Sequence, residues 1–300
     1  MIHEISILIP TRNDVCLSQV QTLQQLASAV KGLQYEIIVS DDASTNQEVI
    51  QQNSQINEIE NCKLLLRDEC AGRAANRNFL AHKAKYDWLL FLDCNVKIPN
   101  EHFLSNYLET DSADVVNGGI FADTDKSLSD KNLRYMYEKK IEPKHTAQQR
   151  QKNPYNSFRT SNFMVRRNAM LDHPLDETVP GYGYEDVLWG KTLCENNIRI
   201  EHIDNPVVMT HFEDNEKYVT KVEEAMHTLY ALRDKLSDYS PLLDTVNVLQ
   251  KKHLIPLFKL FFKGNAQRLR KNLTGTSPSI RWLNVYKLGY YLSIAKESHK

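Results

Sequence analysis

The 300-residue chain has the composition of an ordinary globular protein, with 41% hydrophobic residues, 25% charged residues and a formal net charge of −1. This balance excludes a disordered or collagen-like chain, and no segment reaches the roughly 18 consecutive apolar residues that a membrane-spanning helix needs. The N-terminus has no basic stretch followed by a long apolar region, and the five cysteines include no CxxC pair. We therefore expect reduced thiols and a cytoplasmic protein.

The charge is divided unevenly along the chain. Residues 251–300 contain 11 Lys and Arg residues and one acid, Glu297, so this segment carries +10 and the other 250 residues carry −11. Such a split predicts two parts with different partners. We expect one domain over residues 1–215 and a helical, basic, aromatic-rich extension over residues 216–300.

The first 95 residues alternate apolar strands with amphipathic helices. Strands that are apolar almost throughout, and that are separated by helices, are typical of a parallel sheet covered on both faces. We therefore predict an α/β fold with a mostly parallel, Rossmann-like sheet flanked by helices. The strands are predicted at 5–9, 35–40, 62–66 and 88–92, and the helices at 18–32 and 72–85.

From about residue 117 this pattern breaks down. Residues 139–160 are polar and basic, which predicts a long loop, and our hypothesis is that this loop is a lid over a ligand. Further strands are predicted at 163–165, 199–203 and 207–209, followed by a helix at 216–236.

Acidic residues follow two of the predicted strands. Asp41 and Asp42 end the second strand, and Asp93 follows the fourth. In an open parallel sheet, ligands bind beyond the carboxyl ends of the strands. Each Asp could instead cap the following helix or turn. Two acidic clusters at neighbouring strand ends favour a ligand site, because uncompensated carboxylates repel one another and attract a cation.

Five short motifs occur in order over roughly residues 4–215. They are ILIPTRN at 7–13, IIVSDDAS at 37–44, GRAANRN at 72–78, FLDCN at 91–95 and GYGYED at 181–186. In this order and spacing they resemble the signature of family 2 glycosyltransferases with the GT-A fold. The resemblance implies an inverting glycosyltransferase of the hexosyl or N-acetylhexosaminyl type, with its nucleotide-sugar-binding and catalytic domain over residues 1–215. It further implies a nucleotide-sugar donor, a UDP-sugar by default, and a glycan or lipid-linked acceptor in cell-surface polysaccharide synthesis.

The resemblance gives the first two motifs a role in binding the nucleotide. Pro10, Thr11 and Arg12 would line the nucleotide pocket. One of Asp41 and Asp42 would accept hydrogen bonds from the base, which an ionised carboxylate does well. The sequence does not decide which of the two faces the ligand.

Further donor contacts are expected from a helix start and from a later segment. Arg77, on the helix that Gly72 opens, would meet the diphosphate, where the helix dipole and the guanidinium act together. The alternative for Arg77 is an ordinary surface ion pair. Arg159 and Asn162 are candidates for contacts with the donor sugar or the acceptor.

Three residues are expected to hold a divalent metal, Mn²⁺ or Mg²⁺. Asp93 occupies the first position of the family's Asp-x-Asp metal motif, but Asn95 occupies the third position, so the site loses one negative charge. Alternatively, Asn95 contacts only ribose or sugar while Asp93 holds the ion through water. His211 matches a histidine that completes the metal shell in related enzymes, although a lone histidine is commonly structural.

Glu185 and Asp186 follow a glycine-rich turn at 180–183 and precede a predicted helical stretch at 187–195. An acidic pair at this position can simply stabilise the helix dipole. The resemblance instead makes Asp186 the general base that takes the acceptor proton, and lets Glu185 hold the acceptor or a neighbouring chain segment.

Other functions are weighed against this one. A catalytically silent relative that binds nucleotide or glycan stays open because of Asn95, although the other site residues are intact. A nucleotidyltransferase usually has a glycine-rich loop after its first strand, and residues 10–14 contain no glycine. A dehydrogenase is excluded because no G-x-G-x-x-G follows any strand.

The basic extension mixes lysines and arginines with aromatic residues. Residues 251–300 can lie on an anionic membrane surface at the inner face of the membrane. Equally, their apolar side chains can pack on the first domain or on a second subunit. Because this segment has no recognisable nucleic-acid-binding motif, we expect no nucleic-acid partner. The sequence leaves open the oligomeric state, the donor sugar, the acceptor and the linkage.

Overall fold

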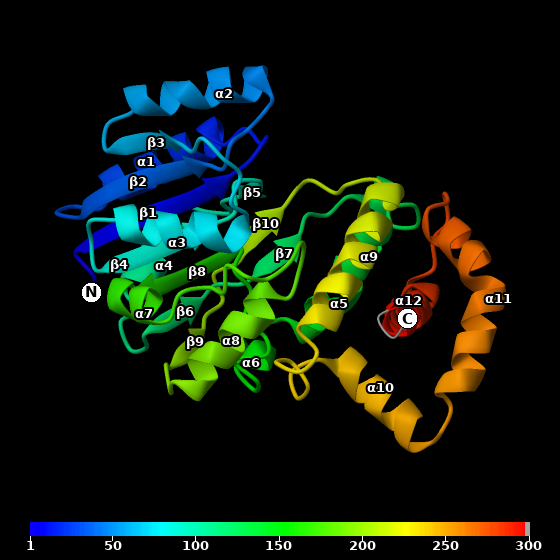
Figure 1. Ribbon diagram of the computed structural model, residues 1–300. Helices are drawn as coiled ribbons and strands as arrows, with labels where there is room; N and C mark the ends of the chain where they lie inside the picture. Colours follow the sequence, from blue (N-terminus) through cyan, green and yellow to red (C-terminus); the bar gives the residue numbers. More distant parts are fainter. Residues whose placement is uncertain (298–300) are drawn as a thin grey trace. The chain divides into compact units, whose positions relative to one another are not determined.

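The computed structural model describes residues 1–297 of the chain (Figure 1). It describes the side chains as far as residue 294. The last three residues of the basic extension lie outside the described residues. Two compact units form. The first contains residues 1–123, 143–177 and 189–211, and the second contains residues 124–142, 178–188 and 212–300. The second unit therefore includes two segments from within residues 1–215, and the division at residue 215 stays a prediction about domains.

A seven-stranded sheet organises the first unit, in the order β3-β2-β1-β4-β8-β6-β9. Strand β8 runs antiparallel to both of its neighbours, and the other neighbouring pairs are parallel, so the predicted mostly parallel α/β sheet is confirmed. The strands are β1 (Glu4–Thr11), β2 (Gln34–Asp41), β3 (Cys62–Leu66), β4 (Trp88–Leu92), β6 (Val115–Asn117), β8 (Asn162–Arg166) and β9 (Ile200–His202).

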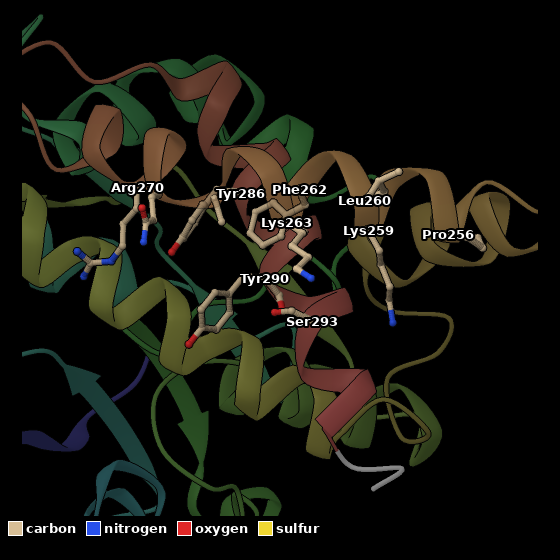
Figure 2. A pocket seen from close by; sticks show the side chains of 12 residues that line it. Pro256, Lys259, Leu260, Phe262, Lys263, Arg270, Tyr286, Tyr290 and Ser293 are labelled. Atoms are coloured by element: carbon tan, nitrogen blue, oxygen red, sulfur yellow. The ribbon is translucent and has the colours of Figure 1, made fainter.

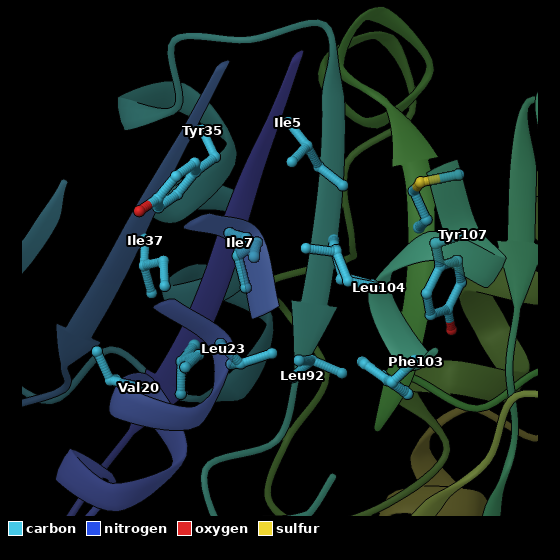
Figure 3. Close-up of a cluster of buried hydrophobic side chains, with 14 of the residues drawn as sticks. Ile5, Ile7, Val20, Leu23, Tyr35, Ile37, Leu92, Phe103, Leu104 and Tyr107 are labelled. Atoms are coloured by element: carbon cyan, nitrogen blue, oxygen red, sulfur yellow. The ribbon is translucent and has the colours of Figure 1, made fainter. Parts of the chain in front are cut away.

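Both faces of this sheet are buried because the central strands are apolar in both directions. Ile5 and Ile7 of β1 pack with Val20 and Leu23 of α1 on one face (Figure 3). Leu8 belongs to the cluster on the opposite face, where helix α3 covers the sheet. The helices of this unit are α1 (Leu17–Ala29), α2 (Gln47–Ser54), η1 (Gln55–Glu58), α3 (Arg73–Lys83), α4 (Phe103–Leu108), α6 (Ala147–Arg150) and α7 (Arg167–Asp172).

A small second sheet in the first unit joins three short strands in the order β5-β10-β7. They are β5 (Val96–Lys97), β7 (Ile120–Ala122) and β10 (Val207–Met209). Met209 pairs with Val96 in the antiparallel ladder between β10 and β5. This pairing brings the chain just after Asn95 alongside the chain just before His211.

Residues 151–160 contain no helix or strand, but the prediction of a long loop over residues 139–160 is wrong for the first part of that segment. The chain here forms the end of α5 (Leu133–Ile141), then η3 (Glu142–Lys144) and α6. Arg150, which is buried, donates hydrogen bonds to the carbonyls of Asn117 and Ile203 and to the Nδ1 of His202. A buried arginine needs hydrogen-bond partners of this kind. Because arginine is usually exposed, the sequence of this segment indicated a solvent-exposed loop, although Arg150 anchors the segment to the first unit.

The second unit is helical, which confirms the predicted helical C-terminal extension. Its helices include α9 (Asn215–Ala231), α10 (Pro241–Lys251), α11 (Ile255–Leu273) and α12 (Ile280–Glu297), together with η2 (Lys126–Leu128) and α5. Helix α8 (Glu185–Glu195) has its first four residues in this unit and the rest in the first. None of the described helices has the length and apolarity needed to cross a membrane.

Close packing holds α11 against α12 and α9. A Cβ atom on Gly289 of α12 would lie 2.0 Å from the ring of Phe262 on α11, so only glycine allows this approach. Arg270 of α11 pairs with Glu216 and Glu223 of α9, and the hydroxyl of Tyr286 donates a hydrogen bond to Glu223 at 2.6 Å. These contacts leave the opposite face of α11 without a partner in the described chain.

Candidate active site

The carboxyl ends of β1 and β2 meet where the nucleotide pocket was predicted. Thr11 pairs with Asp41, and the N–H of Asp42 donates to the Thr11 carbonyl at 2.9 Å. Pro10 is partly buried and Arg12 is exposed at the end of β1. Strands β2 and β4 flank β1, so Asp41 and Asp93 lie at the same edge of the sheet, as the order of parallel strands requires.

The loops after β1 and β2 are tied together by Asn13, which the sequence analysis missed. Its Oδ1 accepts hydrogen bonds from the N–H groups of Thr45 and Asn46, and its own N–H donates to Ser44 Oγ at 2.6 Å. Asn13 and Ala43 both have φ of 56°, a left-handed conformation that asparagine tolerates and alanine adopts rarely. These hydrogen bonds therefore fix the two loops to each other. The sequence signal that could have indicated this link was the asparagine directly after Arg12.

Asp41 and Asp42 are both buried, but their carboxylates have different partners. Asp41 is only 1% exposed; its Oδ1 accepts from the N–H of Ser44 at 2.8 Å, and its Oδ2 has no hydrogen-bond partner. Asp42 accepts from the N–H groups of Ala71 and Gly72 at 3.0 and 2.8 Å. The carboxylate of Asp42 is thus used to hold the loop before α3, whereas Asp41 keeps one acceptor oxygen for another group.

Helix α3 begins at this loop with an N-terminus that has no side-chain cap. Gly72 is its N-cap residue, with φ of 92°, a conformation that favours glycine, and the space where a Cβ would stand is open. The first N–H groups of a helix carry partial positive charge and bind anions well. Asn76, one turn along, bonds both the hydroxyl and the carbonyl of Ser40 and so fixes α3 to the end of β2.

Arg77 and Asp93 form an ion pair, in which Arg77 NH2 lies 2.6 Å from Asp93 Oδ1. The Arg77 side chain is 6% exposed and that of Asp93 is 31% exposed. The backbone of Asp93 is held on both sides, since its N–H donates to the Ser161 carbonyl and its carbonyl accepts from Gln19 Nε2. Arg77 is therefore not an ordinary surface cation: it neutralises the first residue of the expected metal motif.

Asn162 occupies a structural position at the start of β8. It is 1% exposed; its Nδ2 donates to the carbonyls of Gly119 and Asn205, and its Oδ1 accepts from the Tyr107 hydroxyl at 2.7 Å. Both the Nδ2 and the Oδ1 of Asn162 are engaged within the protein, so the geometry favours a structural role over contact with a ligand. Arg159 is partly buried, and its carbonyl accepts from Asn117 Nδ2 at 2.8 Å.

In the second unit, a strained turn precedes the predicted acidic pair. Gly181 and Gly183 have φ of 75° and 90°, and Tyr184 has φ of 66°, which is unfavourable for a bulky side chain. Glu185 and Asp186 then open α8 in its first turn. Strain of this kind persists where the surrounding structure enforces it, and it gathers at ligand-binding and catalytic positions.

Comparison with known proteins places this geometry in a family. The family model described as Glycosyl transferase family 2 matches residues 6–173, which is more than half of the chain. The chain belongs to glycosyl transferase family 2. Its sequence matches no curated protein.

Two solved structures share the fold of this family 2 chain. PcManGT, a mannosyltransferase from Pyrobaculum calidifontis in complex with GDP-Man and Mn²⁺, is 13% identical, with a TM-score of 0.57 over 98% of this chain and 86% of its own. S. aureus TarS, residues 1–349, is 15% identical, with a TM-score of 0.50 over 99% of this chain and 92% of its own. At these identities the likeness establishes the GT-A fold alone.

In this family 2 glycosyltransferase, the residues that were expected to bind metal are Asp93, Asn95 and His211. Within the described residues, no three His, Cys, Asp or Glu side chains lie close enough together to hold an ion. Asn95 and His211 are both exposed, next to the paired strands β5 and β10. Two oxygen donors and one imidazole suit Mn²⁺ or Mg²⁺ chemically. Because Arg77 already balances the charge of Asp93, these residues fit an ion that arrives together with a diphosphate.

Proposed function

We propose that this chain transfers a sugar, with inversion at the anomeric carbon, from a nucleoside diphosphate donor to a glycan or lipid-linked acceptor in cell-surface polysaccharide synthesis. The observation that carries the proposal is the unpartnered, buried Oδ2 of Asp41 beside the open N-terminus of α3. A buried carboxylate oxygen needs a donor, and a nucleotide base supplies one while its phosphates lie toward the helix.

Asp41 is the residue proposed to recognise the base. An acceptor-only carboxylate needs a base that presents an N–H donor, which uracil, thymine and guanine offer on the ring and cytosine offers on its exocyclic amine. A UDP-sugar is the first candidate donor, and the GDP-Man bound by PcManGT makes a GDP-sugar the second. Pro10, Thr11 and Arg12 would line the pocket beside Asp41. Asp42 would hold the loop before α3 in place through its hydrogen bonds to Ala71 and Gly72.

The diphosphate is proposed to lie between the start of α3 and the pair of Arg77 and Asp93. The N–H groups after Gly72 and the guanidinium of Arg77 would bind its oxygens. Asp93, Asn95 and His211 would hold a divalent ion, Mn²⁺ or Mg²⁺, which supplies charge stabilisation for the departing nucleoside diphosphate.

Asp186 is the proposed general base. It would take the proton of the acceptor hydroxyl as the acceptor oxygen bonds to the anomeric carbon. The bond from that carbon to the β-phosphate oxygen breaks at the same time, and the nucleoside diphosphate leaves with the electron pair. A base within hydrogen-bonding reach contributes roughly 10²–10⁴-fold to the rate. Glu185 would hold the acceptor, and Arg159 would contact the donor sugar or the acceptor.

The proposal also covers the roles of the two parts of the chain and the location of the protein in the cell. Residues 1–215 would form the catalytic domain and residues 216–300 an extension. The protein would act in the cytoplasm, peripherally at the inner face of a membrane, through residues 251–300. The net charge of +10 in that segment supports this placement.

A thermal-shift screen tests the proposal directly. UDP-, GDP-, dTDP- and CMP-sugars are compared with and without Mn²⁺. A donor at 100 times its dissociation constant adds about 2.7 kcal/mol to the free energy of unfolding. One base should give a shift that grows with Mn²⁺, and CMP-sugars should give a smaller shift because they carry one phosphate in place of a diphosphate. A protein that responds to none of the four donors does not have this function.

Transfer itself separates the enzyme from a silent binding relative. The donor found by thermal shift is incubated with Mn²⁺ and soluble glycan acceptors, and release of nucleoside diphosphate is measured together with the glycosylated product. Donor binding without turnover on any acceptor would favour the silent relative.

A further inference from the structure

The exposed large hydrophobic side chains gather on one part of the second unit. Nine such residues are exposed in the described chain, and six of them lie between residues 248 and 282. Leu257 and Leu260 are the most exposed of the six, at 66% and 71%. The six are Val248, Leu254, Leu257, Leu260, Phe261 and Trp282.

The exposed apolar residues of α11 share one face of the helix. Leu257, Leu260 and Phe261 are spaced three and four residues apart, which places them side by side. Phe262 and Leu269 are buried in the core with α9 and α12, on the other side of α11. The helix is thus apolar on two faces, one packed and one open. We call Leu257, Leu260 and Phe261 the open face.

Lysines accompany the open face and acids do not. The sequence from residue 245 to residue 296 contains no Asp or Glu. Among the residues whose side chains the structure describes, Lys259 and Lys263 form no ion pair, whereas Arg270 is paired with Glu216 and Glu223. The two lysines are one turn apart and keep their charges for an external partner.

A groove between α11 and α12 runs beside the open face (Figure 2). Its volume is about 710 Å³, and its floor includes Phe262 and Tyr286. The charged residues that line it are all basic: Lys259, Lys263 and Arg270. An apolar floor with a cationic rim suits an amphiphile that has an apolar chain and an anionic head.

We propose that the open face of α11 lies on an anionic phospholipid bilayer, with Leu257, Leu260 and Phe261 among the acyl chains and Lys259 and Lys263 at the phosphates. Helices with an apolar face flanked by lysines bind such interfaces lengthwise. Two other occupants fit less well. A symmetric contact with a second copy would set one +10 segment against another. A nucleic acid would leave the leucines uncovered.

This inference specifies the membrane attachment that forms part of the proposed function. Its experiment needs no nucleotide, so the two can fail separately. The full chain is sedimented with vesicles of phosphatidylcholine alone and with vesicles that contain phosphatidylglycerol, at two salt concentrations. Binding should require the anionic lipid and weaken with salt.

Two paired substitutions test the face. Leu257→Ser with Leu260→Ser should lower the vesicle partition coefficient roughly tenfold or more, because two apolar side chains no longer enter the bilayer. Lys259→Glu with Lys263→Glu should lower it at least ~25-fold, at roughly fivefold for each lysine charge. Leu66→Ser and Lys63→Glu, both exposed positions on β3 of the first unit, are the matched controls and should bind as the unchanged chain does.

Three outcomes overturn the proposal. The first is no binding to anionic vesicles, and the second is binding that the two α11 variants leave intact. The third is a dimer in light scattering that Leu257→Ser with Leu260→Ser abolishes while vesicles are not bound, since a second copy then covers the face. Circular dichroism melting of each variant checks that lost binding does not come from lost folding.

Discussion

Arg77 and Asp93 meet at 2.6 Å, and the guanidinium is buried while the carboxylate is about one-third exposed. The pair joins the helix that is proposed to bind the diphosphate to the residue that is proposed to bind the metal. A cation this close to Asp93 repels a second cation, so the ion should bind weakly until a diphosphate brings its own negative charges. Donor and metal are therefore expected to bind with strong positive coupling.

The first prediction concerns this coupling. Mn²⁺ should bind at least roughly tenfold more weakly to the free protein than to the protein with UDP, or with the diphosphate that the screen selects. Arg77→Met, which keeps the length and loses the charge, should strengthen the binding of Mn²⁺ alone and weaken that of the nucleotide. Titration of free Mn²⁺ by electron paramagnetic resonance measures both. Lys83→Met, at the far end of α3, is the control for loss of one positive charge from the same helix.

The second prediction separates two neighbouring carboxylates. Asp41→Asn replaces the unpartnered Oδ2 by an N–H₂ group, so donor affinity should fall roughly 10–100-fold while the melting temperature holds. Asp42→Asn sets an N–H₂ group against a backbone N–H of Ala71 or Gly72, which should cost about 2–3 kcal/mol of folding stability. Each variant serves as the control for the other. The reverse pattern, with Asp42→Asn stable and unable to bind donor, would exchange the two roles.

The sequence predicted the elements that are long and buried on both faces. Strands β2 and β4 were found because residues apolar in both directions leave an unbroken apolar run. Strands β5, β6 and β7, of two or three residues each, were missed because so few positions give a weak periodic signal, although β9 and β10 are as short as β6 and β7 and were found. The helical segment that ends at Arg150 was mistaken for a loop because its buried arginine is satisfied by distant carbonyls.

The candidate site was predictable in its residue types and not in their partners. Parallel strand order was enough to expect Asp41 and Asp93 at one edge of the sheet. Which aspartate is free for a ligand depends on backbone N–H groups thirty residues away in sequence, at Ala71 and Gly72. The role of Asn162 was uncertain for the same reason, since its partners come from Gly119, just before β7, and from the loop before β10.

The third prediction concerns the acidic pair that opens α8. Asp186→Asn should keep the donor-dependent thermal shift and lose transfer by roughly 10²–10⁴-fold, because the amide cannot accept the acceptor proton. Glu185→Gln should reduce transfer less, mainly through a raised KM for the acceptor. Glu195→Gln, at the other end of α8, is the matched control and should transfer normally. Full activity in Asp186→Asn together with its loss in Glu185→Gln would move the base to Glu185.

The fourth prediction uses His202, which is 7% exposed at the end of β9. One ring nitrogen, Nε2, donates to the Pro154 carbonyl at 2.9 Å, and Nδ1 accepts from Arg150 Nε at 3.0 Å. A second proton on Nδ1 would face the N–H of Arg150, so these contacts hold the neutral ring. Burial, with Arg150 as a further cause, lowers the pKa of His202 from 6.5 to about 4.

The sign of the effect on stability follows from proton binding. Between pH 6.5 and pH 4 the unfolded chain binds a proton that the folded chain does not, so stability falls as the pH falls through this window, by up to about 3 kcal/mol. Urea unfolding at pH 4.5, 5.5 and 7 measures the loss. His202→Gln should be less stable than the unchanged chain at pH 7 and should lose less on acidification. His3→Gln, at an exposed position, should follow the unchanged chain at every pH, because its side chain makes no such contacts among the described residues. If His202→Gln loses as much stability on acidification as the unchanged chain, then carboxylates, and not this ring, set the acid sensitivity.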